Sequence, residues 1–316
     1  MGPAIMVSLA KFKKDALLRG RLTATGRAVL KAAAVATEPL DYYMRRRIAS
    51  QYNKQFPSDC MSKKDGFARL PSGSLPGTTE ILETCRGIFA SKKAALDAAT
   101  PTLRDQKKKK SFLRDLLDND DLRANPILVD FALSDPLFSI VTNYLGVIPT
   151  LNRVDLIYSV SRHNPEEHIS SQLFHQDPEG LRQAKVFLNV FDVDEAEGPF
   201  TFVPASESER AVLGIRRARR QAGAKKDDTR YRDDEVAAHS DPGAALRLMG
   251  PAGEAAGVDT SRCLHAGSRV RPGHFRLVLF IQYCTTHEKG QTFEARRFRS
   301  DRVRWLALER FASPDS

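Results

Sequence analysis

The chain has 316 residues, of which 41% are hydrophobic and 28% are charged, and its formal net charge is +10. This composition is typical of a globular protein and excludes a largely disordered chain, because enough apolar surface is present to build a core. No stretch approaches the ~20 apolar residues of a membrane-spanning helix. The four cysteines are scattered without a CxxC pair, so the sequence indicates neither a zinc knuckle nor a disulfide framework.

The positive charge favours an anionic partner, which is a nucleic acid, a membrane surface or a small acidic substrate. The basic run "RRARR" at 216–220 is typical of a solvated surface, and no aromatic residues are interleaved with it for base stacking. Nucleic acid therefore stays a weak alternative to a small-molecule substrate. The chain begins "MGPAIMVSLAKFKK", with its charges after a short apolar run, the reverse of a secretory signal, so we expect a cytoplasmic protein. The sequence leaves the oligomeric state open.

The first part of the chain carries helical patterns. Residues 24–56 are rich in Ala, Leu and Arg and place apolar residues three and four apart, which predicts two amphipathic helices separated at Pro39. Residues 57–79 are rich in Gly, Pro and Ser and indicate a loop, and a further helix is expected over 78–98. We expect residues 1–110 to form a helical extension packed on the core that follows, as part of one compact domain.

Short helices are expected over 111–146, and the residues from 150 to 298 are instead β-branched and aromatic, with turn signals between short apolar segments. Many short strands at this spacing predict a β-sandwich or jelly roll, so the fold class is mainly β with α. The strand "HFRLVLFIQYC" at 274–284 is apolar on both faces, and the N-terminal helices are the obvious cover for one of them. The core domain spans 111–316, and its long charged insert at 206–244 is a candidate lid.

The segment "SQLFHQDPEG" at 171–180 is the strongest chemical signal. In a strand, His175 and Asp177 point to the same side, so an imidazole and a carboxylate converge. Such a pair holds a metal, orients a catalytic histidine, or is a structural polar pair; an isolated HxD is more often structural.

A second histidine would complete a two-histidine, one-carboxylate face, which leaves iron positions open for a co-substrate and O₂. His265 is the better candidate because it ends the apolar segment "GVDTSRCLH", and His274 is its competitor. Arg276, eleven residues after His265 and inside the next strand, favours His265 over His274 as the second ligand. An arginine inside an apolar strand is costly to bury without an anion, and its planar guanidinium suits a carboxylate. Arg276 as a plain salt-bridge partner is the alternative.

The order of these features resembles the phytanoyl-CoA dioxygenase-like family of iron(II)/2-oxoglutarate oxygenases. The likeness rests on HxD at 175–177, on "KVFLNVFDVDEAEGPFTFVPAS" at 185–206, and on His265 followed eleven residues later by Arg276. It covers roughly 111–298. The sequence departs from the family pattern in a turn, where Ala205 replaces the usual Gly and Glu207 the usual His.

This resemblance implies a double-stranded β-helix, a cupin-like jelly roll with helices packed on its major sheet. It also implies that His175, Asp177 and His265 bind Fe(II) as the catalytic centre, and that Arg276 binds the distal carboxylate of the co-substrate 2-oxoglutarate. With O₂, such an enzyme hydroxylates a small or medium-sized substrate and releases succinate and CO₂. The Asp177 carboxylate disfavours the halide-binding variant of these sites.

Two interpretations stay open at this point. Tyr158, on the strand before the HxD motif, is a candidate hydrogen-bond partner of the co-substrate, with a core tyrosine as the alternative. A metal-dependent isomerase or ligand-binding protein of the cupin type is the alternative function, and it would not need Arg276.

Overall fold

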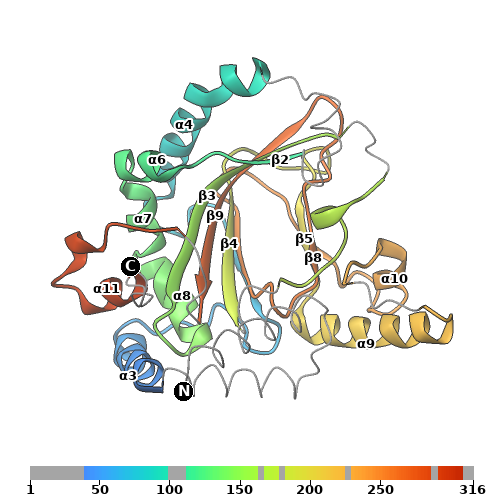
Figure 1. Cartoon of the computed structure of the whole chain (residues 1–316), viewed down its shortest axis with the longest axis horizontal. Coiled ribbons are helices and arrows are strands. Elements are labelled where there is room, and N and C mark those ends of the chain that lie inside the picture. Colours follow the sequence, from blue (N-terminus) through green and yellow to red (C-terminus); the bar gives the residue numbers. More distant parts are fainter. Residues whose placement is uncertain are drawn as a thin grey trace, which may run out of the picture.

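The computed structural model describes residues 39–98, 112–162, 167–177, 182–224, 229–285 and 291–308. Its centre consists of two antiparallel β-sheets, a large one and a small one, drawn side by side in Figure 1. The large sheet has the order β1 (Phe67–Leu70), β7 (Ala255–Val258), β4 (Gln183–Asn189), β9 (Phe275–Cys284), β3 (Thr150–Val160), β2 (Leu113–Asp115). The small sheet has the order β6 (Leu246–Leu248), β5 (Phe200–Phe202), β8 (His265–Ala266).

The chain crosses repeatedly between the two sheets, and from β6 to β9 each consecutive strand lies in the other sheet. The chain passes from β3 and β4 in the large sheet to β5 and β6 in the small one, then returns through β7 to β8 and finally to β9. An isolated bridge between His175 and His265 adds a short extended segment beside β8. This winding is the double-stranded β-helix, so the predicted mainly β jelly roll with helices is confirmed.

Helices cover the outer face of the large sheet (Figure 1). The outward residues of β9 explain why: Leu277, Leu279, Ile281 and Tyr283 belong to one core cluster with apolar side chains of these helices. The predicted two-sided covering of this strand is therefore confirmed. The helical layer consists of α3 (Pro39–Gln55), α4 (Thr78–Ala98), α6 (Asn119–Ala124), α7 (Ile127–Ala132), α8 (Asp135–Leu145) and α11 (Arg302–Leu308).

The helix expected over 78–98 is confirmed as α4. The second helix of the 24–56 pattern begins at Pro39 as α3, while the first, over 24–38, lies outside the described residues. The loop expected over 57–79 is wrong at 67–70, where β1 pairs with β7. Four residues of mixed polarity give too short a pattern to predict an edge strand, although Ala68 and Leu70 are buried.

The charged insert at 206–244 is not a structureless loop in its described part. It contains α9 (Ala205–Gln221) and α10 (Asp233–Ala237), which lie beside the small sheet in Figure 1. Helix α9 buries Ala211, Val212 and Ile215 in a cluster with Phe174 and Tyr231. This packing is typical of an amphipathic helix with one apolar stripe. Residues 225–228 of the insert lie outside the described residues.

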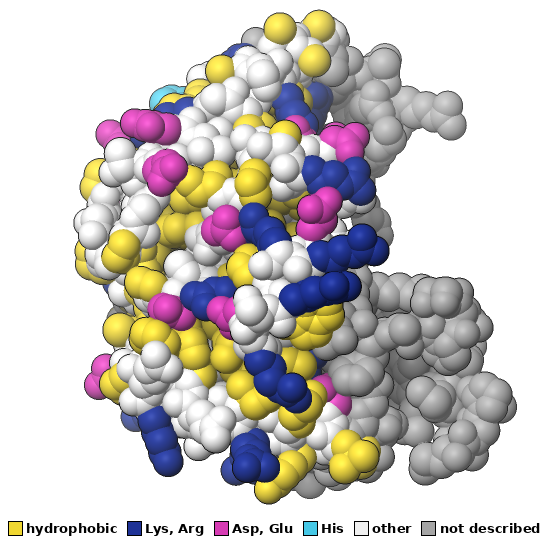
Figure 2. Space-filling model, turned by 90° about the vertical axis from the view of Figure 1, so that its left-hand side faces the viewer, with side chains coloured by type: hydrophobic (Ala, Val, Ile, Leu, Met, Phe, Trp, Pro, Cys, Tyr) yellow, Lys and Arg dark blue, Asp and Glu magenta, His cyan; other side chains and the backbone are white. Residues whose placement is uncertain are grey.

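Charged groups of both signs share the face of the molecule seen in Figure 2, where Lys and Arg are interspersed with Asp and Glu over the helical layer. Mixed signs of this kind are typical of a solvated surface. None of the described helices is both long and apolar enough to span a bilayer.

Candidate metal centre

Two backbone hydrogen bonds bring His175 and His265 side by side. The amide of His175 donates to the carbonyl of His265 at 3.0 Å, and the reverse bond is 2.9 Å long. The two imidazole centroids are 4.2 Å apart. Asp177 completes a group whose ligand atoms all lie within 4.8 Å of one another.

The ring tautomers follow from the partners of the other nitrogens. His175 Nδ1 lies 2.9 Å from the carbonyl of Leu173, and His265 Nδ1 lies 3.1 Å from that of Cys263. A carbonyl oxygen only accepts, so each Nδ1 carries the proton and each Nε2 offers a lone pair. Burial holds the pKa of His175 well below its ordinary value, which keeps this ring neutral.

Asp177 is held as a carboxylate. Burial raises the pKa of Asp177, but the ammonium of Lys185 outweighs burial and holds the pKa well below its usual range. Lys185 Nζ lies 2.7 Å from Asp177 Oδ2. His265 Nε2 lies 3.2 Å from the same oxygen, and His175 Nε2 is 3.6 Å from Oδ1. Two lone pairs and a carboxylate facing one another form an arrangement that a divalent cation satisfies, so these residues fit a metal.

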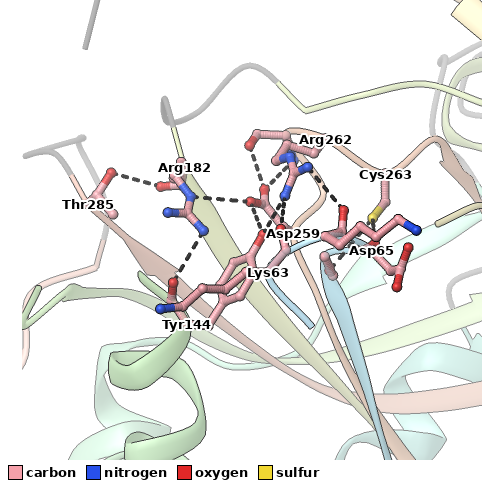
Figure 3. Close-up of polar contacts among 11 residues, drawn as sticks. Lys63, Asp65, Tyr144, Arg182, Asp259, Arg262, Cys263 and Thr285 are labelled. Atoms are coloured by element: carbon pink, nitrogen blue, oxygen red, sulfur yellow. Dashed lines mark hydrogen bonds and ion pairs between the residues drawn. The ribbon is translucent and has the colours of Figure 1, made fainter. Parts of the chain in front are cut away.

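A buried polar network, drawn in Figure 3, surrounds Asp259 in the turn that follows β7. Asp259 is fully buried and accepts hydrogen bonds from Tyr144 Oη at 2.7 Å, Ser261 Oγ at 2.5 Å and the Ser261 amide at 3.1 Å. These bonds fix the turn that leads to His265. The carbonyl of Thr260 in this turn accepts from the Asp177 amide at 2.8 Å, so one turn positions both halves of the centre.

Two arginines attach the network to its surroundings. Arg182 Nε lies 3.9 Å from Asp259 Oδ2 and its Nη2 donates to the Tyr144 carbonyl at 3.2 Å. Arg262 donates to Tyr144 Oη at 3.3 Å and to the Lys63 carbonyl at 2.9 Å, as Figure 3 shows. The turn is thereby tied to the segment before β1 and to helix α8.

Arg276 lies on the inner face of β9, directly across from Ser159 on β3. Its Nη1 donates to the carbonyl of Gly198 at 2.6 Å and its Nη2 donates to Ser268 Oγ at 3.1 Å. A side chain at Gly198 would collide with the backbone at Arg269, 2.5 Å away, so only glycine fits there. Burial lowers the pKa of Arg276 to about 10. Among the described residues its buried Nε has no hydrogen-bond partner.

The guanidinium of Arg276 reaches the strand end that carries His265. A Cβ placed on Gly267, two residues after His265, would lie 3.4 Å from Arg276 Nη2. The structure therefore brings Arg276 to the same side of the fold as the candidate metal-binding group. In the described part of the chain, the two groups seen to accept hydrogen bonds from this buried cation, the Gly198 carbonyl and the Ser268 hydroxyl, are both neutral.

Two other candidates lie elsewhere. Tyr158 is paired with Leu277, on the opposite face of the sheet from Arg276, and its ring packs 5.3 Å from Phe89 and 5.8 Å from Phe275. Tyr158 is a core tyrosine, and the structure does not place it beside His175, Asp177 and His265. His274 Nδ1 lies 2.7 Å from Glu197 Oε1 at a partly exposed position, so it is not part of the group either.

Lys185 and Asp259 are not among the residues that the sequence pattern singles out. The signal for Lys185 is present in "KVFLNVF", where a lysine occupies an inward position of an apolar strand, as Arg276 does in β9. Asp259 has no comparable signal, because its partners Tyr144 and Arg182 are distant in sequence.

The fold and the site define a double-stranded β-helix protein with a buried group suited to a metal. No family model and no curated protein matches the sequence. Similar solved structures include EctD from S. alaskensis with 2-oxoglutarate and 5-hydroxyectoine, at 15% identity and a TM-score of 0.46, covering 75% of this chain and 74% of that one. HygX from Streptomyces hygroscopicus, with nickel and 2-oxoglutarate, has 15% identity and a TM-score of 0.44 over 73% and 85% of the two chains. The carbocyclase SnoK from nogalamycin biosynthesis has 15% identity and a TM-score of 0.42 over 71% and 81%.

Proposed function

We propose that this protein is a non-haem Fe(II)/2-oxoglutarate-dependent dioxygenase that hydroxylates a small or medium-sized substrate. The observation that carries the proposal is one juxtaposition. Two imidazole Nε2 atoms and an ionised carboxylate converge within 4.8 Å, and a buried arginine reaches the strand end of the second histidine. A metal-dependent isomerase needs the first feature but not the second.

Each residue has a distinct role in this proposal. His175, Asp177 and His265 hold Fe(II), and the guanidinium of Arg276 binds the distal carboxylate of 2-oxoglutarate in a two-point contact. When bound, Fe(II) with 2-oxoglutarate supplies the redox chemistry that divides O₂ between succinate and the hydroxylated product, with release of CO₂.

The chain's own contribution is to prepare the ligands. The carbonyls of Leu173 and Cys263 fix the imidazole tautomers, so that both Nε2 lone pairs face inward. Lys185 holds Asp177 ionised and oriented through a 2.7 Å contact. His175 and His265 are each only 5% exposed, so bulk water has little access to the ligand atoms.

Further parts of the proposal rest on the sequence. They are membership of the phytanoyl-CoA dioxygenase-like family, a cytoplasmic location, and one compact domain with a helical extension at 1–110 and a catalytic core at 111–316. The described part of the extension also supplies β1 to the large sheet.

The test is release of succinate from 2-oxoglutarate by protein loaded anaerobically with Fe(II) and then exposed to O₂. We expect succinate from the wild type and a loss of at least about 100-fold in Asp177→Ala, because one of three ligands is gone. The control is Asp120→Ala on α6, where the side chain is 88% exposed. A wild-type protein that binds no Fe(II) would overturn the proposal. Fe(II) binding without any affinity for 2-oxoglutarate would favour the isomerase.

A further inference from the structure

The inner face of the large sheet has two polar ends. Arg276 and Ser159 form one end, where β9 begins. Gln282 forms the other, six residues along β9, which is about 20 Å in an extended strand. Phenylalanines lie between the two ends: the Phe187 ring stacks on Phe200 at 3.9 Å and lies 5.5 Å from Phe280.

The second end contains a chain of three side-chain amides. Asn152 Nδ2 lies 3.4 Å from Gln282 Oε1, and Gln282 Nε2 donates to Gln183 Oε1 at 2.8 Å. This chain leaves a donor, Gln183 Nε2, and an acceptor, Asn152 Oδ1, that have no partner among the described residues. The three residues are 5%, 4% and 0% exposed in the order Asn152, Gln282, Gln183. A buried polar atom without a partner costs about 1–3 kcal/mol, so it indicates a ligand or an ordered water.

This end lies next to the metal ligands. Gln282 is the direct cross-strand neighbour of Lys185, and Lys185 contacts Asp177. Gln183 precedes Lys185 by two residues on β4 and so points to the same face. The amide chain is thus separated from a metal-binding carboxylate by one lysine side chain.

The charges at this end are already paired. Lys185 is matched by Asp177, and Arg153 lies 2.6 Å from both Asp155 and Asp115. The ammonium of Lys185 and the guanidinium of Arg153 lie 5.5 and 5.6 Å from the centre of the Phe280 ring. Since Lys185 and Arg153 each already contact a carboxylate, an anion would have to compete with that carboxylate for them, whereas an uncharged acceptor would meet the unpaired amide of Gln183.

We propose that this second polar end binds the substrate that is oxidised, and that it selects an uncharged amide group whose carbonyl accepts from Gln183 Nε2. Asn152 Oδ1 accepts from a donor further along the same substrate. The inference rests on the proposed function, because 2-oxoglutarate then takes the Arg276 end. It assigns the substrate class as uncharged amides and excludes the anionic substrates that the net charge of the chain suggests.

The test measures how closely four probes of similar size approach the metal. The probes are propionamide, propionate, propylammonium and propane-1,2-diol, added to protein loaded with Mn(II) and 2-oxoglutarate. Broadening of the proton NMR lines of each probe, relative to Zn(II)-loaded protein, reports binding close to the metal. We expect several-fold more broadening of propionamide than of the other three.

Variants then assign the effect to Gln183. Gln183→Leu should remove the excess broadening of propionamide, and Gln183→Glu should transfer the preference to propylammonium because a carboxylate replaces the amide donor. The matched control, Gln51→Leu on the exposed side of α3, should keep the wild-type pattern. Each variant is first shown to bind Mn(II), which confirms that its metal centre is folded.

The outcomes separate this inference from the proposed function. If wild-type protein binds Mn(II) and 2-oxoglutarate but broadens propionate, propylammonium or the diol as much as propionamide, the substrate assignment is overturned and the oxygenase proposal stands. Unchanged propionamide broadening in both Gln183 variants also overturns it. If the wild type does not bind Mn(II), both proposals fall.

Discussion

Arg276 is a cation in an apolar strand, and its immediate contacts are neutral. Gly198 and Ser268 accept hydrogen bonds from its two terminal nitrogens, while its Nε is unpaired within the described part of the chain. Burial of an arginine without a carboxylate is unfavourable unless an anion is bound. Arg276 is therefore stronger evidence for a carboxylate ligand than any charged residue at the protein surface is.

The first prediction concerns this residue. Arg276→Gln should raise the KM for 2-oxoglutarate by roughly 100-fold, because a two-point charged contact is replaced by a single neutral hydrogen bond. Affinity for Mn(II) should stay close to that of the wild type. Steady-state succinate release and Mn(II) titration provide the two readouts.

Tyr158→Phe is the control for Arg276, because Tyr158 precedes Arg276's cross-strand neighbour Ser159 but faces the helices. We expect an unchanged KM for 2-oxoglutarate in this variant. A rise in KM that matches that of Arg276→Gln would contradict the assignment of the co-substrate end.

At the scale of elements, the turn between β7 and β8 links the two halves of the centre. Asp259 organises this turn through Tyr144 and Ser261, and the carbonyl of Thr260 then accepts from the Asp177 amide. Metal-binding residues require such outer contacts for their orientation, and losing one typically costs 10–100-fold in metal affinity. Asp259 is therefore a positioning residue and not a ligand.

The second prediction follows for Asp259→Ala. Its loss leaves buried donors without an acceptor and loosens the turn, so affinity for Mn(II) should fall roughly 10–100-fold. Asp118→Ala is the matched control, since the Asp118 carboxylate likewise accepts from backbone N–H groups, those of Asp120 and Asp121 at the start of α6. That variant should lose about 1 kcal/mol of stability with no change in metal affinity. Equal metal affinity in both variants would refute the positioning role of Asp259.

For the whole molecule, Arg45 joins segments that are far apart in the chain. From helix α3 it contacts Asp41 at 2.9 Å, the Ile148 carbonyl before β3 at 3.2 Å, and the Leu306 carbonyl of α11 at 2.8 Å. The pair of Arg45 and Asp41 is buried. This contact connects the first described helix and the last to the strand that opens the β-helix.

The third prediction tests this connection. Arg45→Leu should destabilise the protein by about 3–5 kcal/mol, because the buried Asp41 carboxylate loses its guanidinium. The double variant Arg45→Leu/Asp41→Leu should recover part of that loss, because it removes the buried charge as well. Urea denaturation measures both, and Mn(II) affinity below the transition should be unchanged. A double variant that is no more stable than Arg45→Leu alone would contradict this account.

The fold was predictable from the sequence where one pattern was long enough to dominate. The two-sided apolar strand at 274–284 and the helix at 78–98 are such cases. The edge strands β1 and β2 were not predictable. They have only four and three residues, and they are extended because they pair with strands distant in the chain. Helix α9 was not predicted, because most of its residues are charged or polar and its buried apolar stripe, which includes Val212 and Ile215, is narrow.

The candidate site was predictable only in part. The HxD spacing and the position of Arg276 in an apolar strand can be recognised from local sequence alone. That His175 lies beside His265 depends instead on a β-bridge between segments ninety residues apart. The amide chain of Asn152, Gln282 and Gln183 joins three strands, so no spacing in the sequence indicates it. Its existence depends on register, which a β-bulge between Leu151 and Arg153 adjusts.

Anomalous diffraction at the iron edge from an anaerobic crystal soaked with Fe(II) and 2-oxoglutarate is the most direct test of the oxygenase proposal. We predict one peak among His175 Nε2, His265 Nε2 and the Asp177 carboxylate, with 2-oxoglutarate contacting both this ion and the guanidinium of Arg276. Iron bound at other residues, or 2-oxoglutarate bound away from Arg276, would contradict it.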